Sequence, residues 1–257
     1  MRDEGIHTIA LEEIVDADWA DRIPDPQWET YRRVLHEVAR VGRPFALGGA
    51  FALATYTNTW RDTKDLDLYV LPGDRDPMVE ALERAGLSDL FEKLPYDRGW
   101  IYRATSDDSI VDIIWSMANR RAEVDMRWLD HGARIRVRGE VLRIVPVEEM
   151  IWAKMYVLQR DRCDWPDVIN LIHSRGPELD WRHLLHRAQD DAALIAGVLA
   201  VFSWLFPSRS AELPSWLWNR LRVTRPTASP GINGSRLHLL DPRPWHRTSA
   251  ETTSYPP

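Results

Sequence analysis

The spacing of hydrophobic residues changes along this chain, and the change separates segments with different predicted structures. Apolar residues at helical spacing over 27–41 predict an amphipathic helix. From residue 44 to 145, short apolar runs alternate with turn residues and brief helical segments, which is typical of a mixed α/β core. From residue 146 to about 206 the apolar residues again recur at helical spacing. We therefore expect a series of helices in that region.

Composition sets the ends of the chain apart from its middle. Residues 1–26 are acidic and poorly periodic, which predicts an N-terminal arm. Residues 223–257 are rich in proline, serine, threonine and glycine, and this favours a disordered tail because such a segment buries little apolar surface. The predicted organisation is an arm over 1–26, a core over 27–145, a helical region over 146–222 and the tail.

One predicted strand of the core carries two acidic residues on the same face. Residues 65–70, Asp-Leu-Asp-Leu-Tyr-Val, alternate polar and apolar side chains, so Asp65 and Asp67 project in the same direction. Carboxylate oxygens suit Mg²⁺, which proteins often hold with one or two carboxylates together with substrate phosphates. The pair predicts a magnesium site. The alternative is a solvated strand face, where acidic pairs of this kind are common.

A pair of glycines precedes this strand, at a predicted junction between a strand and a helix. Residues 44–47 form an apolar run that ends at Gly48, and residues 50–54 have a helix-forming composition. Glycine lets the backbone approach a ligand closely, and a helix N-terminus offers unpaired N–H groups to an anion. Gly48 and Gly49 therefore predict a phosphate-binding turn, and the alternative is a turn without a ligand. Together with the two aspartates, they predict a site for a metal-bound nucleoside triphosphate.

A third carboxylate lies in the middle of an apolar strand. Residues 109–115, Ser-Ile-Val-Asp-Ile-Ile-Trp, contain Asp112 as their only acid. An ionised carboxylate is costly in such surroundings unless it is paired or bound to a metal. We expect Asp112 beside Asp65 and Asp67, where it would complete the metal site and accept a proton from an attacking hydroxyl. The alternatives are an acid at the exposed end of an edge strand and an acid paired with an arginine. Asp125, in a more charged segment, is a second candidate for this role.

These motifs resemble the catalytic core of the nucleotidyltransferase fold, the DNA polymerase β-like superfamily. The resemblance is carried by Gly48-Gly49-Ala50, by residues 61–68 and by Val111-Asp112. A second block, over 146–154 and 160–167, resembles the lysine-bearing helix and the Arg-Asp…Asp segment of a bacterial group that contains AbiEii-type toxins and stand-alone nucleotidyltransferases. Antibiotic nucleotidyltransferases are more distant relatives. Many members carry a serine where this chain has Ala50, so backbone N–H groups would have to contact the phosphate there.

The resemblance implies a nucleotidyltransferase-like mixed β-sheet core with flanking helices, followed by a C-terminal helical region. It implies an enzyme that moves a nucleoside monophosphate from a triphosphate (NTP) to an acceptor hydroxyl and releases pyrophosphate. Two Mg²⁺ ions would be held by Asp65 and Asp67, with Asp112 as the third ligand and the base. The acceptor is left open between tRNA or another RNA, a protein and a small molecule, and so is an antitoxin partner. The alternative is a catalytically inactive member of the fold that senses nucleotides or binds a protein.

Three basic residues suit the binding of a triphosphate. Arg61 and Lys64 flank the strand that carries the aspartates, and Lys154 lies in a predicted amphipathic helix. Nucleotidyl transfer depends mainly on positioning and on the neutralisation of charge, which cations supply. We predict that these three side chains contact phosphate oxygens. The alternatives are ordinary loop charge for the first two and a solvated helix face for Lys154.

Net charge, cysteine content and hydropathy indicate which partners and which cellular compartment to expect. The formal net charge is −6 and the pI is about 5.8, which argues against a broad nucleic-acid surface because such surfaces are basic. The single cysteine, Cys163, excludes an intrachain disulfide and fits a reducing cytoplasm. No apolar run in the sequence reaches transmembrane length, so we expect no membrane association.

Overall fold

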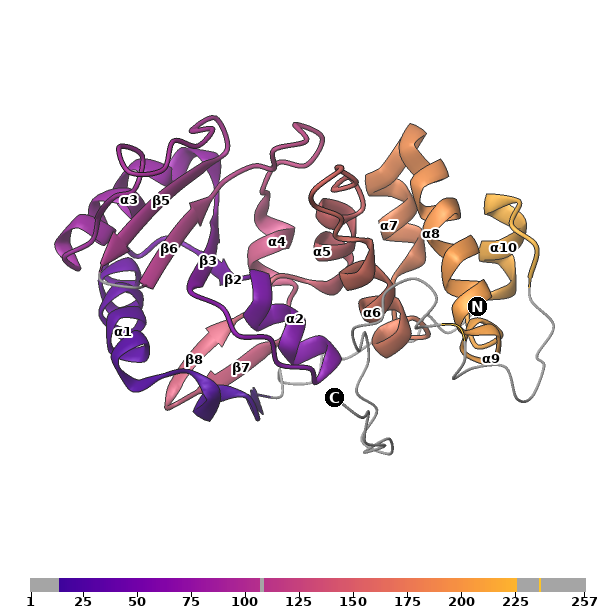
Figure 1. Ribbon diagram of the computed structural model, residues 1–257, viewed down its shortest axis with the longest axis horizontal. Coiled ribbons are helices and arrows are strands. Elements are labelled where there is room, and N and C mark those ends of the chain that lie inside the picture. Colours follow the sequence, from indigo (N-terminus) through magenta and orange to yellow (C-terminus); the bar gives the residue numbers. More distant parts are fainter. Residues whose placement is uncertain (1–13, 107–108, 226–235, 237–257) are drawn as a thin grey trace, which may run out of the picture. The chain divides into compact units, whose positions relative to one another are not determined.

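The computed structural model describes residues 14–106, 109–225 and 236 of the 257-residue chain (Figure 1). The chain divides into two compact units. Unit 1 runs to Ala52 and also contains Asp62–Ser116 and Glu123–Pro146. Unit 2 contains Leu53–Arg61, Met117–Ala122 and the residues from Val147 onward. The last boundary lies where the hydrophobic spacing changes in the sequence, but two short segments from the middle of the chain also belong to unit 2.

The central sheet of unit 1 is mixed and has five strands in the order β2-β3-β6-β5-β4. The strands are β2 (Phe45–Leu47), β3 (Asp65–Val70), β4 (Ser88–Asp89), β5 (Ile101–Ser106) and β6 (Ser109–Ile114). Strands β3 and β6 run parallel, and the other neighbouring pairs are antiparallel. This arrangement, with the helices around it, confirms the predicted mixed α/β class of the core.

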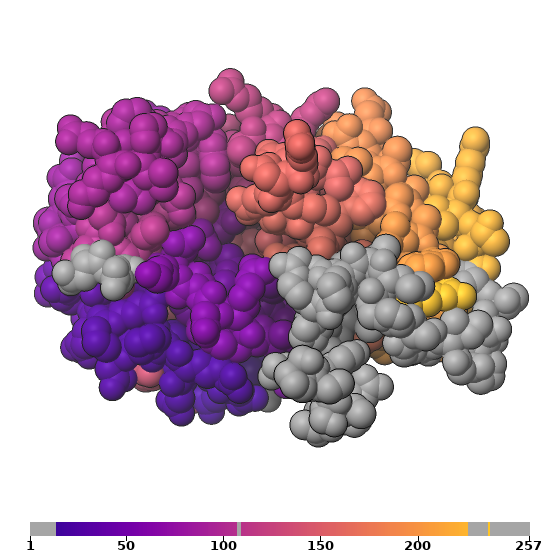
Figure 2. All heavy atoms as spheres, viewed as in Figure 1, coloured from indigo at the N-terminus to yellow at the C-terminus, as the bar shows by residue number. Residues whose placement is uncertain are grey.

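The two faces of this sheet differ in polarity because β3 alternates. Leu66 and Leu68 are almost fully buried, whereas Asp65 and Asp67 on the opposite face are partly exposed. Helix α1 (Asp25–Arg40) covers the apolar face, since its residue Tyr31 lies against the same core as Leu66. Helix α3 (Arg75–Arg84) packs beside α1 and contacts β6 (Figure 1). Figure 2 shows the same view with all heavy atoms as spheres.

A smaller sheet in unit 1 has the strand order β1-β7-β8. Its strands are β1 (Ile14–Asp16), β7 (Arg134–Val137) and β8 (Glu140–Arg143). Strand β2 links the two sheets, because the carbonyl oxygen of Leu47 accepts a hydrogen bond from the amide of Val145 at 2.9 Å. The remaining elements of unit 1 are the turns of 3-10 helix η1 (Ala20–Arg22) and η2 (Pro72–Asp74), the start of α2 (Gly49–Thr57) and α4 (Met126–Asp130).

Part of the predicted N-terminal arm belongs to the fold. Strand β1 pairs with β7 in parallel, and Trp19 and Ile23 are buried in the core of unit 1. The segment Ile14–Asp16 is too short to give a periodic signal in the sequence. Residues 1–13 of the predicted arm, and most of the predicted tail over 223–257, lie outside the described residues.

Unit 2 is mainly helical between Val147 and Leu221, which confirms the predicted C-terminal helical region. Its elements are α5 (Val147–Lys154), α6 (Trp165–Arg175), α7 (Trp181–Ala188), η3 (Gln189–Asp191), α8 (Ala192–Leu205), α9 (Pro207–Ser210) and α10 (Ser215–Leu221). Helix α5 ends at Lys154. The chain then turns at Gln159, whose amide donates to the carbonyl oxygen of Arg162 at 2.7 Å.

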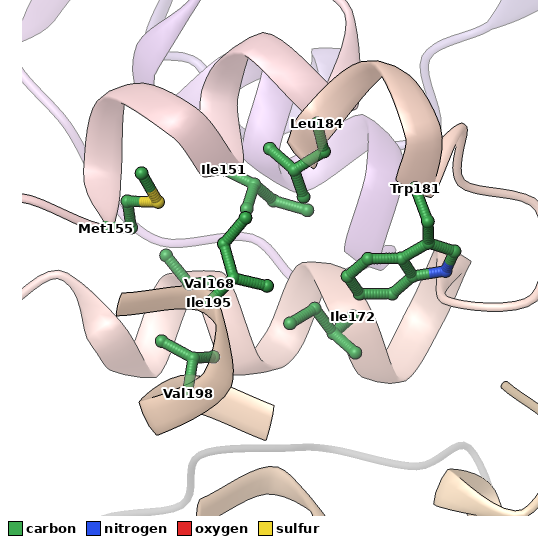
Figure 3. A pocket seen from close by; sticks show the side chains of 8 residues that line it. All are labelled: Ile151, Met155, Val168, Ile172, Trp181, Leu184, Ile195 and Val198. Carbon is green, nitrogen blue, oxygen red and sulfur yellow. The ribbon is translucent and has the colours of Figure 1, made fainter. Parts of the chain in front are cut away.

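The core of unit 2 is apolar and nearly filled. Eight side chains from α5 to α8, and from the residue after α5, converge on one small space (Figure 3). They are Ile151, Met155, Val168, Ile172, Trp181, Leu184, Ile195 and Val198. The space leaves about 10 Å³ for the centre of a water molecule, which is no more than one water needs. It is a gap in core packing and not a ligand site.

One segment of unit 2 is long and apolar enough to cross a membrane by length and composition alone. Residues Trp181–Leu205 have a mean hydropathy of 1.3 in their most apolar 18-residue window, and 33% of that window is buried. This finding differs from the expectation drawn from the sequence. Packed core helices also have this length and hydropathy, and the apolar part, α8, contacts α6, α7, α9 and α10. We therefore assign the segment to the core of unit 2.

A buried ion cluster joins α5 to α7 in unit 2. The side chain of Glu149 is fully buried and accepts hydrogen bonds from Nε2 of His183 at 2.7 Å and from Nη2 of Arg187 at 3.1 Å. The guanidinium of Arg187 also lies over the ring of Trp152, 5.0 Å from its centroid. All of these bonds reach Oε1 of Glu149, and the cationic partners there compensate the charge of the buried carboxylate.

We predict that Glu149→Ala lowers the free energy of unfolding by about 3–5 kcal/mol, because the charge of Arg187 loses its buried partner. The measurement is urea unfolding followed by circular dichroism. Glu178→Ala is the control, since Glu178 forms an exposed pair with Arg175 at 3.3 Å and such pairs contribute little. Equal effects of the two substitutions would contradict a structural role for the Glu149 cluster.

Candidate active site

Three carboxylates lie on one face of the central sheet of unit 1. Asp67 on β3 pairs in register with Asp112 on the parallel strand β6. Side chains of residues paired in this way point to the same face, and Asp65, two residues before Asp67, shares that face. The structure thus brings together the three acids that the sequence singles out, and their role in catalysis stays a prediction.

Asp112 is buried in the middle of the sheet and not at its edge. Strand β6 lies between β3 and β5, and Asp112 is only 3% exposed. This position excludes the exposed end of an edge strand. Burial raises the pKa of the Asp112 carboxyl to about 6; the guanidinium of Arg103 opposes this rise, and the charge of Asp65 adds to it.

The arginine partner that the sequence analysis left as an alternative is Arg103 on β5. Its Nε donates to Oδ1 of Asp112 at 2.9 Å and to Oδ2 at 3.2 Å. Its Nη2 lies 3.6 Å from Oδ2 of Asp65. The sequence analysis did not identify Arg103, although a signal exists. Residues 101–106 and 109–114 are joined by only two residues, and a hairpin of that length pairs Arg103 with Asp112.

The two glycines bring the start of helix α2 against the acidic face of β3. The amide of Gly48 donates to the carbonyl oxygen of Asp67 at 2.9 Å. Gly49 has φ +54°, and a Cβ atom there would lie 1.6 Å from Oδ2 of Asp67. A Cβ at Gly48 would lie 2.2 Å from the ring of Tyr69. Only glycine fits this approach, which places a helix N-terminus, with its partial positive charge, beside a carboxylate.

Lys64 directly precedes the acidic strand, and its backbone is firmly held. Its carbonyl oxygen accepts from the hydroxyl of Tyr31 at 2.9 Å and from the amide of Ile110 at 2.8 Å. The hydroxyl of Tyr31 in turn accepts from Nε2 of Gln27 at 2.6 Å. Burial raises the pKa of this phenol, and so does the charge of Asp65. These bonds fix the start of β3, while Lys64 itself is exposed.

Arg61 and Lys154 belong to unit 2, where both are bonded to acids. Nζ of Lys154 donates to Oδ2 of Asp164 at 2.9 Å and to Oδ2 of Asp167 at 2.8 Å. Nη1 of Arg61 lies 3.4 Å from Oδ1 of Asp167. Burial alone would lower the pKa of Lys154, but these acids raise it. Lys154 is therefore not on a solvated helix face, and phosphate contacts of the two cations stay a prediction.

Asp125, the second candidate for the third carboxylate, has a structural role. It is the N-cap of α4, and its Oδ1 accepts from the amide of Arg127 at 3.0 Å. An N-cap aspartate satisfies an otherwise unpaired N–H group of the first helical turn. The position of Asp125 before a helix, and not on a strand beside Asp65, corrects this part of the sequence analysis.

The carboxylate face fits a divalent cation by its chemistry. It offers hard oxygen donors from three acids on two neighbouring strands, the ligand type that Mg²⁺ prefers. Within the described part of the chain, no group of three or more His, Cys, Asp or Glu side chains is arranged to hold a metal ion. Both oxygens of Asp112 are bonded to Arg103. A cation held by all three acids would therefore compete with Arg103 for Asp112.

Comparisons with known proteins give weak likenesses. No protein-family model matches the chain, and no curated protein does. A solved structure of the antibiotic-resistance factor ANT(2'')-Ia is 19% identical, with a TM-score of 0.42, over 74% of this chain and 95% of that one. The lincosamide antibiotic adenylyltransferase LnuA is 14% identical, with a TM-score of 0.40, over 56% and 94%. JHP933 from Helicobacter pylori is 14% identical, with a TM-score of 0.39, over 76% and 82%. These values assign no activity to this chain.

We predict that Gly49→Ala destabilises unit 1 by more than the about 1–2 kcal/mol that a left-handed backbone costs an alanine, because its methyl group meets Asp67. Gly42→Ala is the matched control, since Gly42 has φ +69° and no atom within 4 Å of the place that a methyl group would take. Urea unfolding of the two variants measures the difference. A Gly49→Ala variant no less stable than Gly42→Ala would contradict the close approach of α2 to Asp67.

We also predict a pH-dependent gain in stability for Asp112→Asn without divalent cations. The carboxyl pKa is about 6 in the folded protein against 3.8 as its ordinary value, so the folded state binds the proton more tightly. The stabilisation is present below the ordinary pKa and is lost as the pH rises through about 6. Relative to wild type, the amide variant should be equally stable near pH 4 and on the order of 1–3 kcal/mol more stable near pH 8.

Urea unfolding at a series of pH values tests this expectation. Asp76→Asn is the control, because Asp76 is exposed on α3 and pairs only at the surface with Arg75. A variant that is less stable than wild type near pH 8 would show that the bond to Arg103 outweighs the cost of burying the charge.

Proposed function

We propose that this chain is a metal-dependent nucleotidyltransferase that moves a nucleoside monophosphate from an NTP to an acceptor hydroxyl. The observation that carries the proposal is the register of β3 and β6, which sets Asp67 beside Asp112 and gives both the same face as Asp65. The start of α2 at Gly49 supports it, because a helix N-terminus that can approach an anion closely lies next to those acids.

Each acid has a distinct role in the proposed reaction. Asp65 and Asp67 would hold Mg²⁺ together with the triphosphate, and the ion would neutralise phosphate charge. The acceptor oxygen forms a bond to the α-phosphorus, the bond from that phosphorus to the bridging oxygen breaks, and pyrophosphate leaves. The acceptor's proton passes to Asp112.

The phosphate contacts follow from the elements around the acids. The first N–H groups of α2 would face phosphate oxygens, and Lys64 would supply a cation at the exposed start of β3. Phosphate contacts of Arg61 and Lys154 are part of the same proposal. The acceptor is an RNA, a protein or a small molecule. An antitoxin partner would place the chain in the AbiEii-type group.

The second candidate function is a catalytically inactive protein that binds nucleotides. The observation that favours it is the pair of hydrogen bonds from Arg103, which engages both oxygens of Asp112. One measurement distinguishes the two candidate functions. An enzyme transfers label from an α-phosphate-labelled NTP to an acceptor, whereas a sensor binds the NTP without transfer.

We predict that Asp65→Ala and Asp67→Ala each reduce transfer at least about 100-fold while the protein stays folded, because a lost metal ligand removes several kcal/mol of transition-state stabilisation. The assay incubates each labelled NTP and Mg²⁺ with an aminoglycoside, a lincosamide, tRNA and a cell extract. Asp76→Ala is the control, since Asp76 is an exposed acid of the same unit. Wild-type transfer by both variants would exclude the metal site; NTP binding without transfer by the wild type would support the sensor.

A further inference from the structure

Arg103 occupies the position where the carboxylate face most needs positive charge. Its side chain is 24% exposed and lies between the carboxylates of Asp112 and Asp65, at 2.9 Å and 3.6 Å. Asp112 is buried, and a buried carboxylate without a partner is strongly destabilising. In the absence of another cation, the guanidinium therefore supplies the compensating charge for this face.

Arg103 holds Asp112 through a single N–H group. Only Nε donates to Asp112, and it divides its single hydrogen between the two oxygens at 2.9 Å and 3.2 Å. The parallel two-bond arrangement of arginine with a carboxylate, which is the strongest one, is not formed. The 3.6 Å separation from Asp65 is too long for a hydrogen bond. A small rotation of the side chain could thus release Asp112 and keep the attraction to Asp65.

We propose that Arg103 is an internal counter-cation that a divalent metal ion displaces, so that it holds Asp112 in place before the ion binds and releases it afterwards. This inference rests on the proposed function, because it takes Asp65, Asp67 and Asp112 as the ligands of that ion. It assigns Arg103 the role of a positioning residue, which acts through Asp112. It also reconciles the arginine pair with a carboxylate site, since the two arrangements are alternative states of one cluster.

If the inference is correct, replacing Arg103 changes the affinity of the protein for a divalent cation. The ion and the guanidinium compete for Asp112, so Arg103→Met should bind Mn²⁺ more tightly than wild type, by on the order of 10-fold. The same substitution should lower the thermal midpoint when no divalent cation is present. The difference from wild type should shrink at saturating Mg²⁺, because an ion that binds only the folded state stabilises it.

The experiment measures Mn²⁺ affinity by electron paramagnetic resonance and thermal midpoints with and without Mg²⁺. Arg103→Lys should bind Mn²⁺ nearly as wild type does, because it keeps the charge. Arg136→Met is the matched control, since Arg136 is an arginine of the same unit that forms an exposed pair with Asp16 at 2.8 Å. It should change neither the affinity nor the effect of Mg²⁺ on the midpoint.

The outcomes separate this inference from the proposed function. Mn²⁺ binding that Asp65→Ala abolishes, but that Arg103→Met leaves unchanged or weakens, would overturn the inference alone. An equal fall in midpoint with and without Mg²⁺ would also overturn it, because a merely structural arginine behaves in that way. Absence of Mn²⁺ binding by the wild type would overturn both proposals.

If Arg103→Met does not fold, a measurement on the wild-type chain takes its place. The Nε–H group of Arg103 gives its own signal in a proton–nitrogen correlation spectrum. Addition of Mg²⁺ should shift this signal and speed its exchange with water, because the hydrogen bonds to Asp112 are lost. A signal that stays unchanged at saturating Mg²⁺ would overturn the inference.

Discussion

The parallel pairing of β3 with β6 is the constraint on which both the core and the candidate site of unit 1 depend. Because side chains alternate along a strand, the register that sets Asp67 beside Asp112 also turns Leu66 toward α1 and buries Leu68 on the same face. A slip by one residue would bury the aspartates and expose the leucines. The burial of the apolar face thus fixes the position of the carboxylates, and the energy of the core holds together charges that repel one another.

That repulsion explains two features that are otherwise unrelated. Arg103 on β5 compensates Asp112 from one side, and the start of α2 approaches Asp67 from the other, where Gly49 leaves room for the carboxylate. Each brings positive charge or positive dipole to the acidic face. Both lie beside the aspartates and not across the sheet. The positive charge and positive dipole beside the face thus lower the cost of holding these carboxylates together.

The sequence predicts those parts of the site that local spacing determines. Alternation over 65–70 gives the common face of Asp65 and Asp67, and the apolar neighbours of Asp112 give its burial. The partner of a buried charge depends on strand pairing, so Arg103 was not identified. Tertiary contacts likewise decide that Lys154 bonds two aspartates and that Asp125 caps a helix. Strand β1 was missed because three residues carry no periodic signal.

The buried charges of the two units differ in how they are compensated, and this difference supports the proposal of a ligand site on the carboxylate face. In unit 2, Glu149 meets both His183 and Arg187, and each aspartate beside Lys154 also contacts an arginine. Each of these acids thus has two cationic partners, an arrangement that serves stability. On the carboxylate face, two acids share one cationic partner: the guanidinium of Arg103 contacts both Asp112 and Asp65. A cluster in which two acids share one cation has a net negative charge, and a cation from outside the chain can balance it.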